Sequence, residues 1–456
     1  MLCSFLALAL LAAPDAPWGD LAVELLTRYL QVDTTNPPGN ELRAAQFLKE
    51  VLEKEGIAVT LDEFAPGRAN LIAVLSGSGR KRPIALMNHT DVVPADPARW
   101  SVPPFAGAIK DGRIYGRGAV DMKGEGIVQL VAFLRLKREN ARLDRDVIFL
   151  ATADEEDAFG GIERVLWPEG WRERVLAAEY LLTEGGENRV GADGKPLYFG
   201  IQTAQKSPFW LKLETTGEPG HGSRPLANAA LNRLIRALER VRAWRTELRA
   251  LPSVAKFFRD QAPRMTGPEA EWYKDIAKAI ADPEAARALY DGDPSLSSLL
   301  RDSVSITVVK AGYKTNVIPG SAMAELDVRL LPGTEPEAFL AKLRAVIDDA
   351  SVTITPIGAV RPPAESRIDT ELFTLIERVV GAHHPGIPIT TKMGTGATES
   401  SLLRPLGVTC YGFTPLLLTT AEDASQHGDD ERVPLATLKE SVGIFYDVIA
   451  GIARAQ

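Results

Sequence analysis

Residues 84–91 read Ile-Ala-Leu-Met-Asn-His-Thr-Asp, an apolar run that leads directly into a histidine and an aspartate. Residues 71–75 and 147–151 form similar apolar runs, and a helix-like stretch at 124–137 lies before the second of them. Short runs without polar alternation are typical of strands in a sheet that is covered on both faces. With amphipathic stretches before them, at 20–30 and 41–55, they predict an α/β fold in which helices sandwich the sheet.

The pattern changes near Lys206. A strand-like run at 209–215 leads into a long helix expected at 227–251, and a charged helical insertion follows to about Leu300. Strands return at 303–309 and 322–331, which predicts an inserted lid of two-layer α+β type. Because Pro332-Gly333 is a typical turn, we expect the chain to return there to the first domain.

The first residues form an apolar run that is shorter than the roughly 20 residues of a membrane-spanning helix. Small residues near Ala16 offer cleavage sites, but the basic residues that normally precede such a run are missing. The pattern slightly favours a signal peptide over a mis-assigned start or a buried first helix. With a signal peptide the protein would be periplasmic or secreted, and otherwise cytoplasmic. The expected parts are a leader at 1–16, a catalytic domain at 17–206 and 332–456, and a lid and dimerisation domain at 207–331.

Composition narrows the class of partner. A chain of 456 residues that is 45% hydrophobic has room for more than one domain. The net charge of −8 gives no electrostatic reason to expect nucleic acid or an anionic membrane, and no other segment is long and apolar enough to cross a bilayer. A small molecule is the expected partner. The only cysteines are Cys3 and Cys410, so we expect no internal disulfide in the mature protein.

Acids and a histidine follow the predicted strands. His89 and Asp91 follow one strand, and functional groups collect beyond the carboxyl ends of strands in open α/β sheets. Glu155 and Glu156 follow the strand at 147–151 in an acidic run that would alone indicate a solvated loop. In a metal site, one of two such carboxylates binds a cation and the other transfers protons. Glu184 follows a further strand-like run at 180–183.

The remaining signals are weaker when taken singly. Asp121 lies in the glycine-rich stretch 115–124, where an aspartate alone would indicate a helix N-cap. The chain has only five histidines, of which His427 precedes the last helix and His221 lies in the lid. The pair His383-His384 more simply marks the end of a helix. Neither a phosphate-binding loop nor Gly-x-Ser-x-Gly is present, so nucleotide binding and serine hydrolysis are disfavoured.

Taken together, these segments resemble the aminoacylase and carboxypeptidase family of two-zinc metallopeptidases, which includes acetylornithine deacetylase, succinyl-diaminopimelate desuccinylase, glutamate carboxypeptidase and carnosinase-type dipeptidases. The resemblance is carried by an ordered series of motifs at 89–94, Trp100, Pro104-Phe105, Asp111-Gly112 and 115–124, and it extends over nearly the whole chain after the leader.

The resemblance implies a ligand set for two metal ions. Asp121 would bridge both metals, with His89 and Glu184 completing one site and Glu156 and His427 the other. Two divalent cations, three carboxylates and one hydroxide also sum to zero charge. Zinc is the default metal, and manganese or cobalt would also fit nitrogen and oxygen ligands.

The resemblance also implies roles around the metals. Glu155 would be the general base and Asp91 would orient His89. His221 would hydrogen-bond the developing oxyanion, often from the partner subunit of a homodimer formed through the lid. Asn316 and Arg329 match lid positions that contact substrate, and Arg329 would hold a carboxylate, although an exposed strand arginine is nearly as good an interpretation. A cis peptide is expected at Asp121-Met122.

One segment departs from the family pattern. The family usually reads Gly-Gly-Thr-Asp-Ala-Arg where this chain has Gly-Ala-Thr-Glu-Ser-Ser at 396–401. Gly396 and Thr398 keep their expected place beside the substrate, whereas the other changes are expected to alter the pocket wall. The predicted function is metal-dependent hydrolysis of the amide bond of dipeptides, C-terminal residues or N-acyl amino acids. The alternative is a catalytically inactive dimeric binding or scaffold protein, which the complete set of ligands and acids disfavours.

Overall fold

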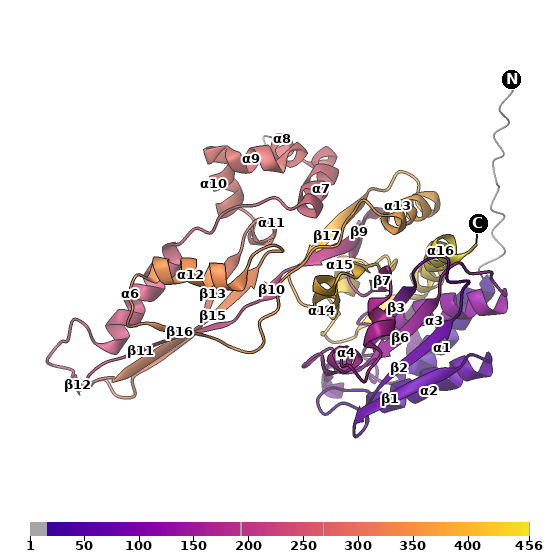
Figure 1. Ribbon diagram of the computed structural model, residues 1–456, viewed down its shortest axis with the longest axis horizontal. Coiled ribbons are helices and arrows are strands. Elements are labelled where there is room, and N and C mark those ends of the chain that lie inside the picture. The colour runs from indigo at the N-terminus through magenta and orange to yellow at the C-terminus, as the bar shows by residue number, and fades with distance from the viewer. Residues whose placement is uncertain (1–15, 192–193, 268, 456) are drawn as a thin grey trace.

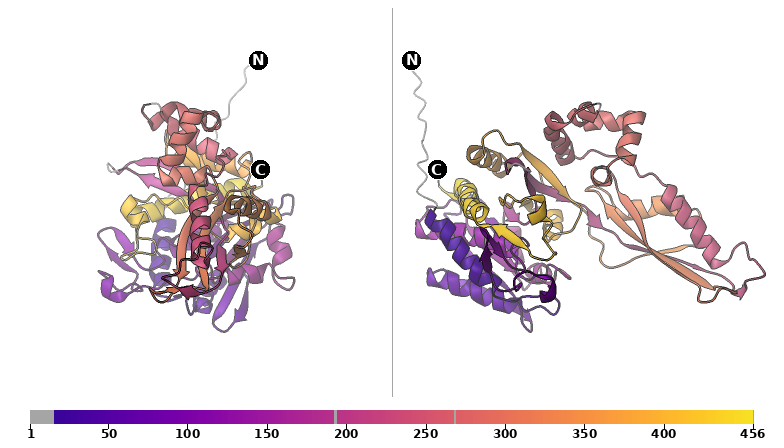
Figure 2. Two further views of the ribbon diagram at one scale, coloured as in Figure 1. Left: turned by 90° about the vertical axis from the view of Figure 1, so that its left-hand side faces the viewer. Right: turned by 180° about the vertical axis from the view of Figure 1, so that it is seen from behind.

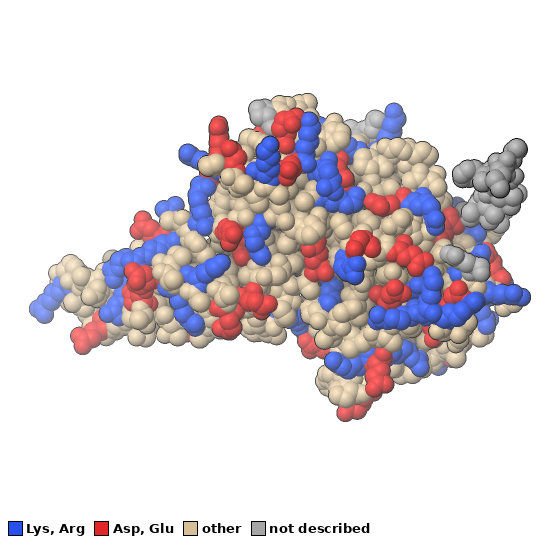
Figure 3. Space-filling view, turned by 45° about the horizontal axis from the view of Figure 1, so that its top comes forward, with Lys and Arg blue, Asp and Glu red and all other residues tan. Residues whose placement is uncertain are grey.

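The computed structural model describes residues 16–191, 194–267 and 269–455, so the expected leader lies outside the described residues except for Ala16. The chain forms a broad domain and an elongated second domain that extends from it (Figures 1 and 2). None of the described helices combines the length and apolar character that crossing a membrane requires. On the face shown in Figure 3, acidic and basic side chains are interspersed over both domains.

A nine-stranded sheet forms the centre of the broad domain, in the order β1-β2-β6-β3-β7-β18-β9-β17, with β8 paired to β9. The strands are β1 (Val59–Ala65), β2 (Arg68–Leu75), β3 (Ile84–His89), β6 (Val147–Thr152), β7 (Tyr180–Thr183), β8 (Glu187–Val190), β9 (Pro196–Gln205), β17 (Ile389–Gly394) and β18 (Thr409–Gly412). The neighbours β6, β3, β7 and β18 are parallel. Their carboxyl ends therefore lie at one edge of the sheet.

Helices cover both faces of this sheet, as the apolar strands predict. In β3, Ile84 and Leu86 point into the core beneath one layer of helices, whereas Ala85 and Met87 point into the opposite core. The first layer is α1 (Ala16–Leu30), α2 (Glu41–Lys54), α3 (Lys123–Arg138), α13 (Glu371–His383) and α16 (Leu435–Ala453). The second layer is α4 (Gly160–Val165), α5 (Arg172–Leu176) and α14 (Ser400–Leu403). Strands β4 (Ala108–Lys110), β5 (Arg113–Tyr115) and β19 (Arg432–Pro434) form a small separate sheet.

The second domain has the expected two layers. Its antiparallel sheet contains β10 (Ser207–Pro208), β11 (Leu211–Thr216), β13 (Ser303–Ala311), β15 (Ser321–Leu330) and β16 (Thr353–Pro356). Helices α6 (Ala230–Ala243) and α12 (Pro336–Ile347) pack on one face of it. Strands β12 (Gly220–His221) and β14 (Val317–Ile318) pair at the far tip of this domain (Figure 1).

Three boundary predictions in this region are wrong. Pro332-Gly333 does form a turn, with Gly333 at φ 79°, but the turn leads into α12, and β16 then pairs with β11 of the lid sheet. The chain therefore returns to the broad domain after Pro356. The helix expected at 227–251 begins at Ala230 and ends at Ala243, because Trp244 adopts an extended conformation.

The helical insertion also packs differently from the prediction. It contains α7 (Pro252–Gln261), α8 (Glu269–Lys274), α9 (Ile276–Ala281), α10 (Pro283–Asp291) and α11 (Pro294–Leu299). Val254 and Phe258 of α7 share an apolar cluster with Ala204 of β9 and Met393 of β17. The insertion therefore covers the edge of the large sheet, although its sequence lies inside the lid segment.

Candidate metal centre

Three of the predicted ligands lie just beyond the carboxyl ends of adjacent parallel strands. His89 ends β3, Glu156 follows β6, and Glu184 follows β7. Because β6 and β7 flank β3 on either side, these side chains meet at one edge of the sheet. The strands themselves are fully buried, and the ligand candidates lie where they end: His89 is the last residue of β3, and Glu156 and Glu184 lie in the loops after β6 and β7.

Asp121 and His427 complete two groups of potential ligands that share Asp121. His89, Asp121 and Glu184 form one group and Asp121, Glu156 and His427 the other, with the ligand atoms of each group within 4.8 Å of one another. One carboxylate oxygen of Asp121 lies 3.0 Å from Nε2 of His89, and the other lies 3.1 Å from Nε2 of His427. The five predicted ligands are therefore brought together, with Asp121 placed between the two histidines.

The donor set fits two divalent cations. Glu156 has one buried carboxylate oxygen without a hydrogen-bond partner, and its other oxygen lies 3.2 Å from Nε2 of His427. Hydrogen bonds with Asp121 and Glu156 raise the pKa of His427 to about 10. Burial lowers the pKa of His89, but its contacts with Asp121 and other acids outweigh burial and raise it well above the ordinary value. These shifts reflect a concentration of negative charge that cations would neutralise.

Glu431, a residue near the C-terminus, binds the backbone around Asp121. The peptide bond Asp121-Met122 is cis, as expected. The Glu431 carboxylate accepts hydrogen bonds from the backbone N–H groups of Gly118, Val120 and Asp121, at 2.9, 2.7 and 3.0 Å. Arg117 donates to the same carboxylate at 2.8 Å. Sequence reasoning missed Glu431, whose acidic surroundings at 429–431 indicate nothing more than a solvated loop.

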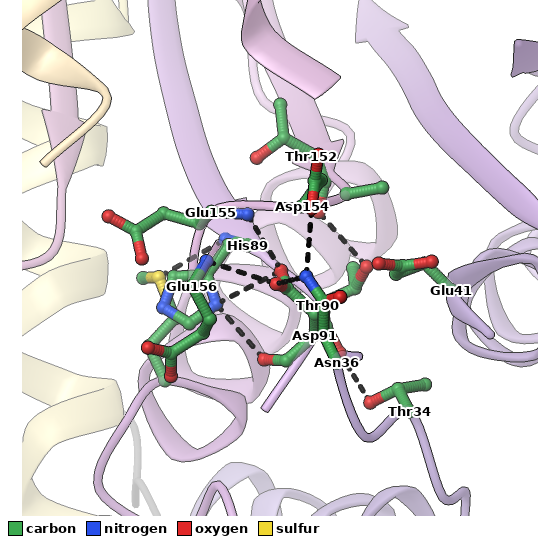
Figure 4. Close-up of polar contacts among 12 residues, drawn as sticks. Thr34, Asn36, Glu41, His89, Thr90, Asp91, Thr152, Asp154, Glu155 and Glu156 are labelled. Carbon is green, nitrogen blue, oxygen red and sulfur yellow. Dashed lines mark hydrogen bonds and ion pairs between the residues drawn. The ribbon is translucent and has the colours of Figure 1, made fainter. Parts of the chain in front are cut away.

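Asp91 binds the loop after β6 in addition to the predicted contact with His89 (Figure 4). Its carboxylate accepts hydrogen bonds from the backbone N–H groups of Glu155 and Glu156, at 3.1 and 3.0 Å. The Nδ1 atom of His89 lies 3.1 Å from the backbone oxygen of Asp91 and 3.6 Å from its carboxylate. Asp91 thus contacts His89 mainly through its backbone, while its side chain holds the loop that carries the predicted base and a predicted metal ligand.

A buried polar network behind Asp91 was also missed (Figure 4). The Asn36 side-chain amide donates to Asp91 at 2.9 Å and to Asp154 at 2.8 Å. Arg68 pairs with Asp154 at 2.9 Å and with Glu41 at 3.1 Å. Although Glu41, Asp91 and Asp154 lie close enough to hold a cation, Arg68 and Asn36 already compensate them. This group therefore supports the metal centre and needs no ion of its own.

Glu155 faces a cavity of about 400 Å³ that also exposes Asp121, Glu156, Glu184 and His427. Burial, and then the like charge of Glu184, raise the pKa of Glu155 well above its ordinary value. Gly396 and Thr398 line the same cavity, as the resemblance implies. The hydroxyl of Thr398 donates to Oε1 of Gln205 at 2.8 Å, which fixes it against the sheet.

The lid residues lie apart from this centre within one chain. His221 is exposed on β12 at the tip of the lid, where the backbone N–H of Gly222 donates to the Asn316 carbonyl at 2.8 Å (Figure 1). Arg329 donates to Asp327 at 2.7 and 3.2 Å and lines a second cavity of about 490 Å³, which also contacts Trp210 and Arg361. The structure brings His221 and Asn316 together, but it does not bring either to the metal ligands of the same chain.

The histidine pair lies at the end of a helix, as expected. His383 ends α13 and its Nε2 lies 2.9 Å from Asp447, and His384 lies 3.4 Å from Glu440. Cys410 is buried, and burial raises the pKa of its thiol to about 12, which leaves it without nucleophilic character at neutral pH.

Comparisons with known proteins agree with this geometry. The profile of peptidase family M20/M25/M40 matches residues 85–451. Human aminoacylase-1 is 27% identical over 443 residues, covering 95% of each chain. The N-fatty-acyl-amino acid synthase/hydrolase PM20D1 of Xenopus tropicalis is 26% identical over 406 residues, covering 85% of this chain and 76% of the relative.

Solved structures share the fold. The M20 family metallo-carboxypeptidase Sso-CP2 of Sulfolobus solfataricus superimposes with a TM-score of 0.67 at 20% identity, covering 94% of this chain and 98% of the other. Human carnosine dipeptidase 1 gives a TM-score of 0.58 at 15% identity, covering 96% of this chain and 98% of the other.

Proposed function

The chain belongs to peptidase family M20/M25/M40, and from this premise we propose that it is a two-metal amidohydrolase that cleaves N-acyl amino acids or short peptides. The family and the aminoacylase-like relatives support hydrolysis of an amide bond. The observation that carries the proposal is the position of Asp121, whose two carboxylate oxygens face His89 and His427 from two ligand groups beside Glu155.

The proposed ligands of one metal are His89, Asp121 and Glu184, and those of the other are Asp121, Glu156 and His427. Zinc is the first choice, and manganese or cobalt also suits these donors. When bound, the two metal ions supply Lewis acidity that polarises the scissile carbonyl and makes the attacking water more acidic.

Glu155 is proposed to accept a proton from that water and to deliver it to the leaving nitrogen. Its carboxylate lines the same cavity as the proposed metal ligands Asp121, Glu156 and Glu184. Asp91 positions this base, because its carboxylate holds the backbone of Glu155 and Glu156. In this proposal Asp91 acts through these neighbours and makes no contact with substrate.

The lid is proposed to act across a homodimer. His221 and Asn316 share the lid tip, remote from the metal ligands of their own chain, so a second copy would have to bring them over the cavity to contact the substrate. Arg329 is proposed to hold a substrate carboxylate, for which it would have to share its guanidinium with Asp327. Gly396 and Thr398 are proposed to contact the substrate from the cavity wall.

The test is hydrolysis of a panel of dipeptides and N-acyl amino acids by protein reconstituted with zinc or manganese. Glu155→Gln should abolish turnover while the bound metal is retained, and a chelator should abolish turnover of the wild type. Glu169→Gln is the matched control, because Glu169 is exposed and remote from the cavity. An inert wild type that still binds metal would refute the proposal and favour a binding or scaffold protein.

A further inference from the structure

The cavity extends beyond the metal centre and has a partly apolar wall. Val120, Met122, Leu416 and Leu418 contribute apolar surface to it. The scissile carbonyl must lie beside Glu155 and the proposed metal ligands, and Arg329, proposed to hold the substrate carboxylate, lines a different cavity. The group on the acyl side of the bond therefore has this cavity available to it. The polar side chains of the same wall therefore influence which acyl groups the cavity accepts.

The charged side chains of the wall are compensated inside the protein. Glu187 pairs with Lys392 and, at 2.5 Å, with Arg189, and Arg189 also pairs with Asp423 at 3.0 Å. The two negative charges and the two positive charges of these side chains thus cancel. These four residues therefore offer no uncompensated charge for a charged acyl group to pair with.

The remaining acid in the wall, Glu125, is also engaged. It is buried, and its carboxyl group contacts the Thr414 hydroxyl and, at 3.1 Å, the Gln129 amide. Burial raises the pKa of Glu125 to about 8, which leaves it mostly uncharged at neutral pH.

Gln202 differs from the other polar residues of this wall. It lines the cavity, is only 6% exposed, and its carboxamide has no hydrogen-bond partner among the described residues. By contrast, Asn188 donates to the Leu416 carbonyl at 3.4 Å and accepts from the Gly200 N–H at 3.2 Å. The Gln202 carboxamide is therefore free to bind a ligand.

The site around Gln202 is closely built. A Cβ atom at Gly185 or Gly394 would lie 2.8 or 2.9 Å from its side-chain oxygen, so a larger residue at either position would displace the carboxamide. Gly185 directly follows the proposed ligand Glu184. The two glycines therefore leave room for the amide beside the residue that follows Glu184, close to the proposed metal centre.

Resting on the proposed function, we infer that the cavity binds an uncharged acyl group bearing a hydrogen-bonding oxygen or nitrogen, and that Gln202 recognises this group. A purely apolar acyl group would remove water from the carboxamide without replacing its hydrogen bonds. A charged acyl group would be desolvated without a partner of opposite charge. A neutral polar group avoids both losses, and the apolar wall receives the rest of the chain.

Three acyl groups of nearly equal size test this inference when attached to one amino acid. They are succinamoyl, which is neutral and polar, 4-methylpentanoyl, which is apolar, and succinyl, which is anionic. For the wild type, kcat/KM should be highest with succinamoyl and lowest with succinyl. In Gln202→Met, kcat/KM for succinamoyl should fall roughly tenfold, as expected for one lost hydrogen bond, while the value for 4-methylpentanoyl stays level or rises.

Gln31→Met is the matched control, since Gln31 lies outside the cavity and its side-chain amide donates to the Ala106 carbonyl at 3.2 Å. A wild type that prefers 4-methylpentanoyl or succinyl would overturn the inference while leaving the proposed function intact. Equal losses for all three substrates in Gln202→Met would also overturn it, because they would show a general structural role. Absence of hydrolysis across these substrates and the wider panel would instead refute the proposed function, and the inference with it.

Discussion

The ion pairs of Glu187 allow a quantitative test of the cavity wall. Its carboxylate contacts Lys392, Arg189 at 2.5 Å and the Tyr198 hydroxyl at 2.8 Å, and its side chain is only 14% exposed. Burial alone would raise the pKa of Glu187, but the charge and hydrogen bond of Lys392 outweigh burial and lower the pKa from 4.5 to about 2. Replacing Glu187 by glutamine keeps the shape and removes this charge.

The size and sign of the effect of Glu187→Gln on the free energy of unfolding follow from the change in the pKa of Glu187. A carboxyl group whose pKa falls from 4.5 to about 2 on folding contributes about 3 kcal/mol at neutral pH, since each pH unit corresponds to about 1.4 kcal/mol. Because the folded-state pKa is the lower one, the contribution is complete above pH 4.5 and disappears as the pH falls toward 2. The stability difference between wild type and Glu187→Gln should therefore be largest near pH 7 and shrink below 4.5.

The measurement is urea unfolding at several pH values, with a chelator present so that metal binding does not add its own pH dependence. Glu50→Gln is the control, because Glu50 also pairs with a lysine, Lys54, but lies exposed at the surface, and the substitution should change stability little at any pH. A Glu187→Gln effect as small as that of Glu50→Gln, or one that stays constant down to pH 3, would refute this reasoning.

Three further predictions concern the metal centre and the lid. Asp91→Asn should weaken metal affinity about 10- to 100-fold in competition with a chelating dye, because the amide cannot accept both backbone hydrogen bonds; unchanged affinity would contradict the positioning role. Removing metal should lower the melting temperature. Where free metal exceeds its Kd a thousandfold, removal should lower the free energy of unfolding by about 4 kcal/mol. His427→Ala should reduce this metal dependence, and an equal melting temperature with and without metal would contradict the proposed centre. Finally, mixing inactive His221→Ala and Glu155→Gln proteins with subunit exchange should restore about a quarter of wild-type activity, because each hybrid dimer has one intact site; no recovery despite hybrid formation would show that His221 does not act across subunits.

The strand ends explain why the residues that gather at the proposed metal centre could be predicted from sequence. His89, Glu156 and Glu184 each follow a short apolar strand, so a local pattern identifies them, and the sheet edge brings them together. The supporting residues carry no such pattern. Asn36 contacts Asp154 across 118 positions of the chain, and Arg117 contacts Glu431 across 314. Their partners depend on the complete fold, and a single sequence contains no local sign of them.

The predicted end of the lid at residue 331 is wrong for a related reason. The turn at Pro332-Gly333 is a local feature, and the sequence predicts it correctly. Which sheet the following strand joins depends instead on the strand with which it pairs. Strand β16 pairs with β11, which lies far earlier in the chain. The insertion shows the same effect, since α7 packs on β17, a strand that occurs much later in sequence. Local patterns thus predict elements, whereas nonlocal pairing decides which domain receives them.

The changes in the segment that departs from the family pattern reach the cavity wall only in part, since Ala397 lines the cavity and Glu399 does not. Only Gly396, Ala397 and Thr398 of residues 396–401 line the cavity beside the metal centre. Glu399 is buried behind the wall, where its carboxyl group contacts the Thr152 hydroxyl at 2.8 Å, and burial raises its pKa to about 8. The exchange of aspartate for glutamate therefore changes the support of the wall more than its surface. Gln202 reaches the same cavity from β9, and its carboxamide has no partner among the described residues, so the proposed recognition of the acyl group rests on this side chain.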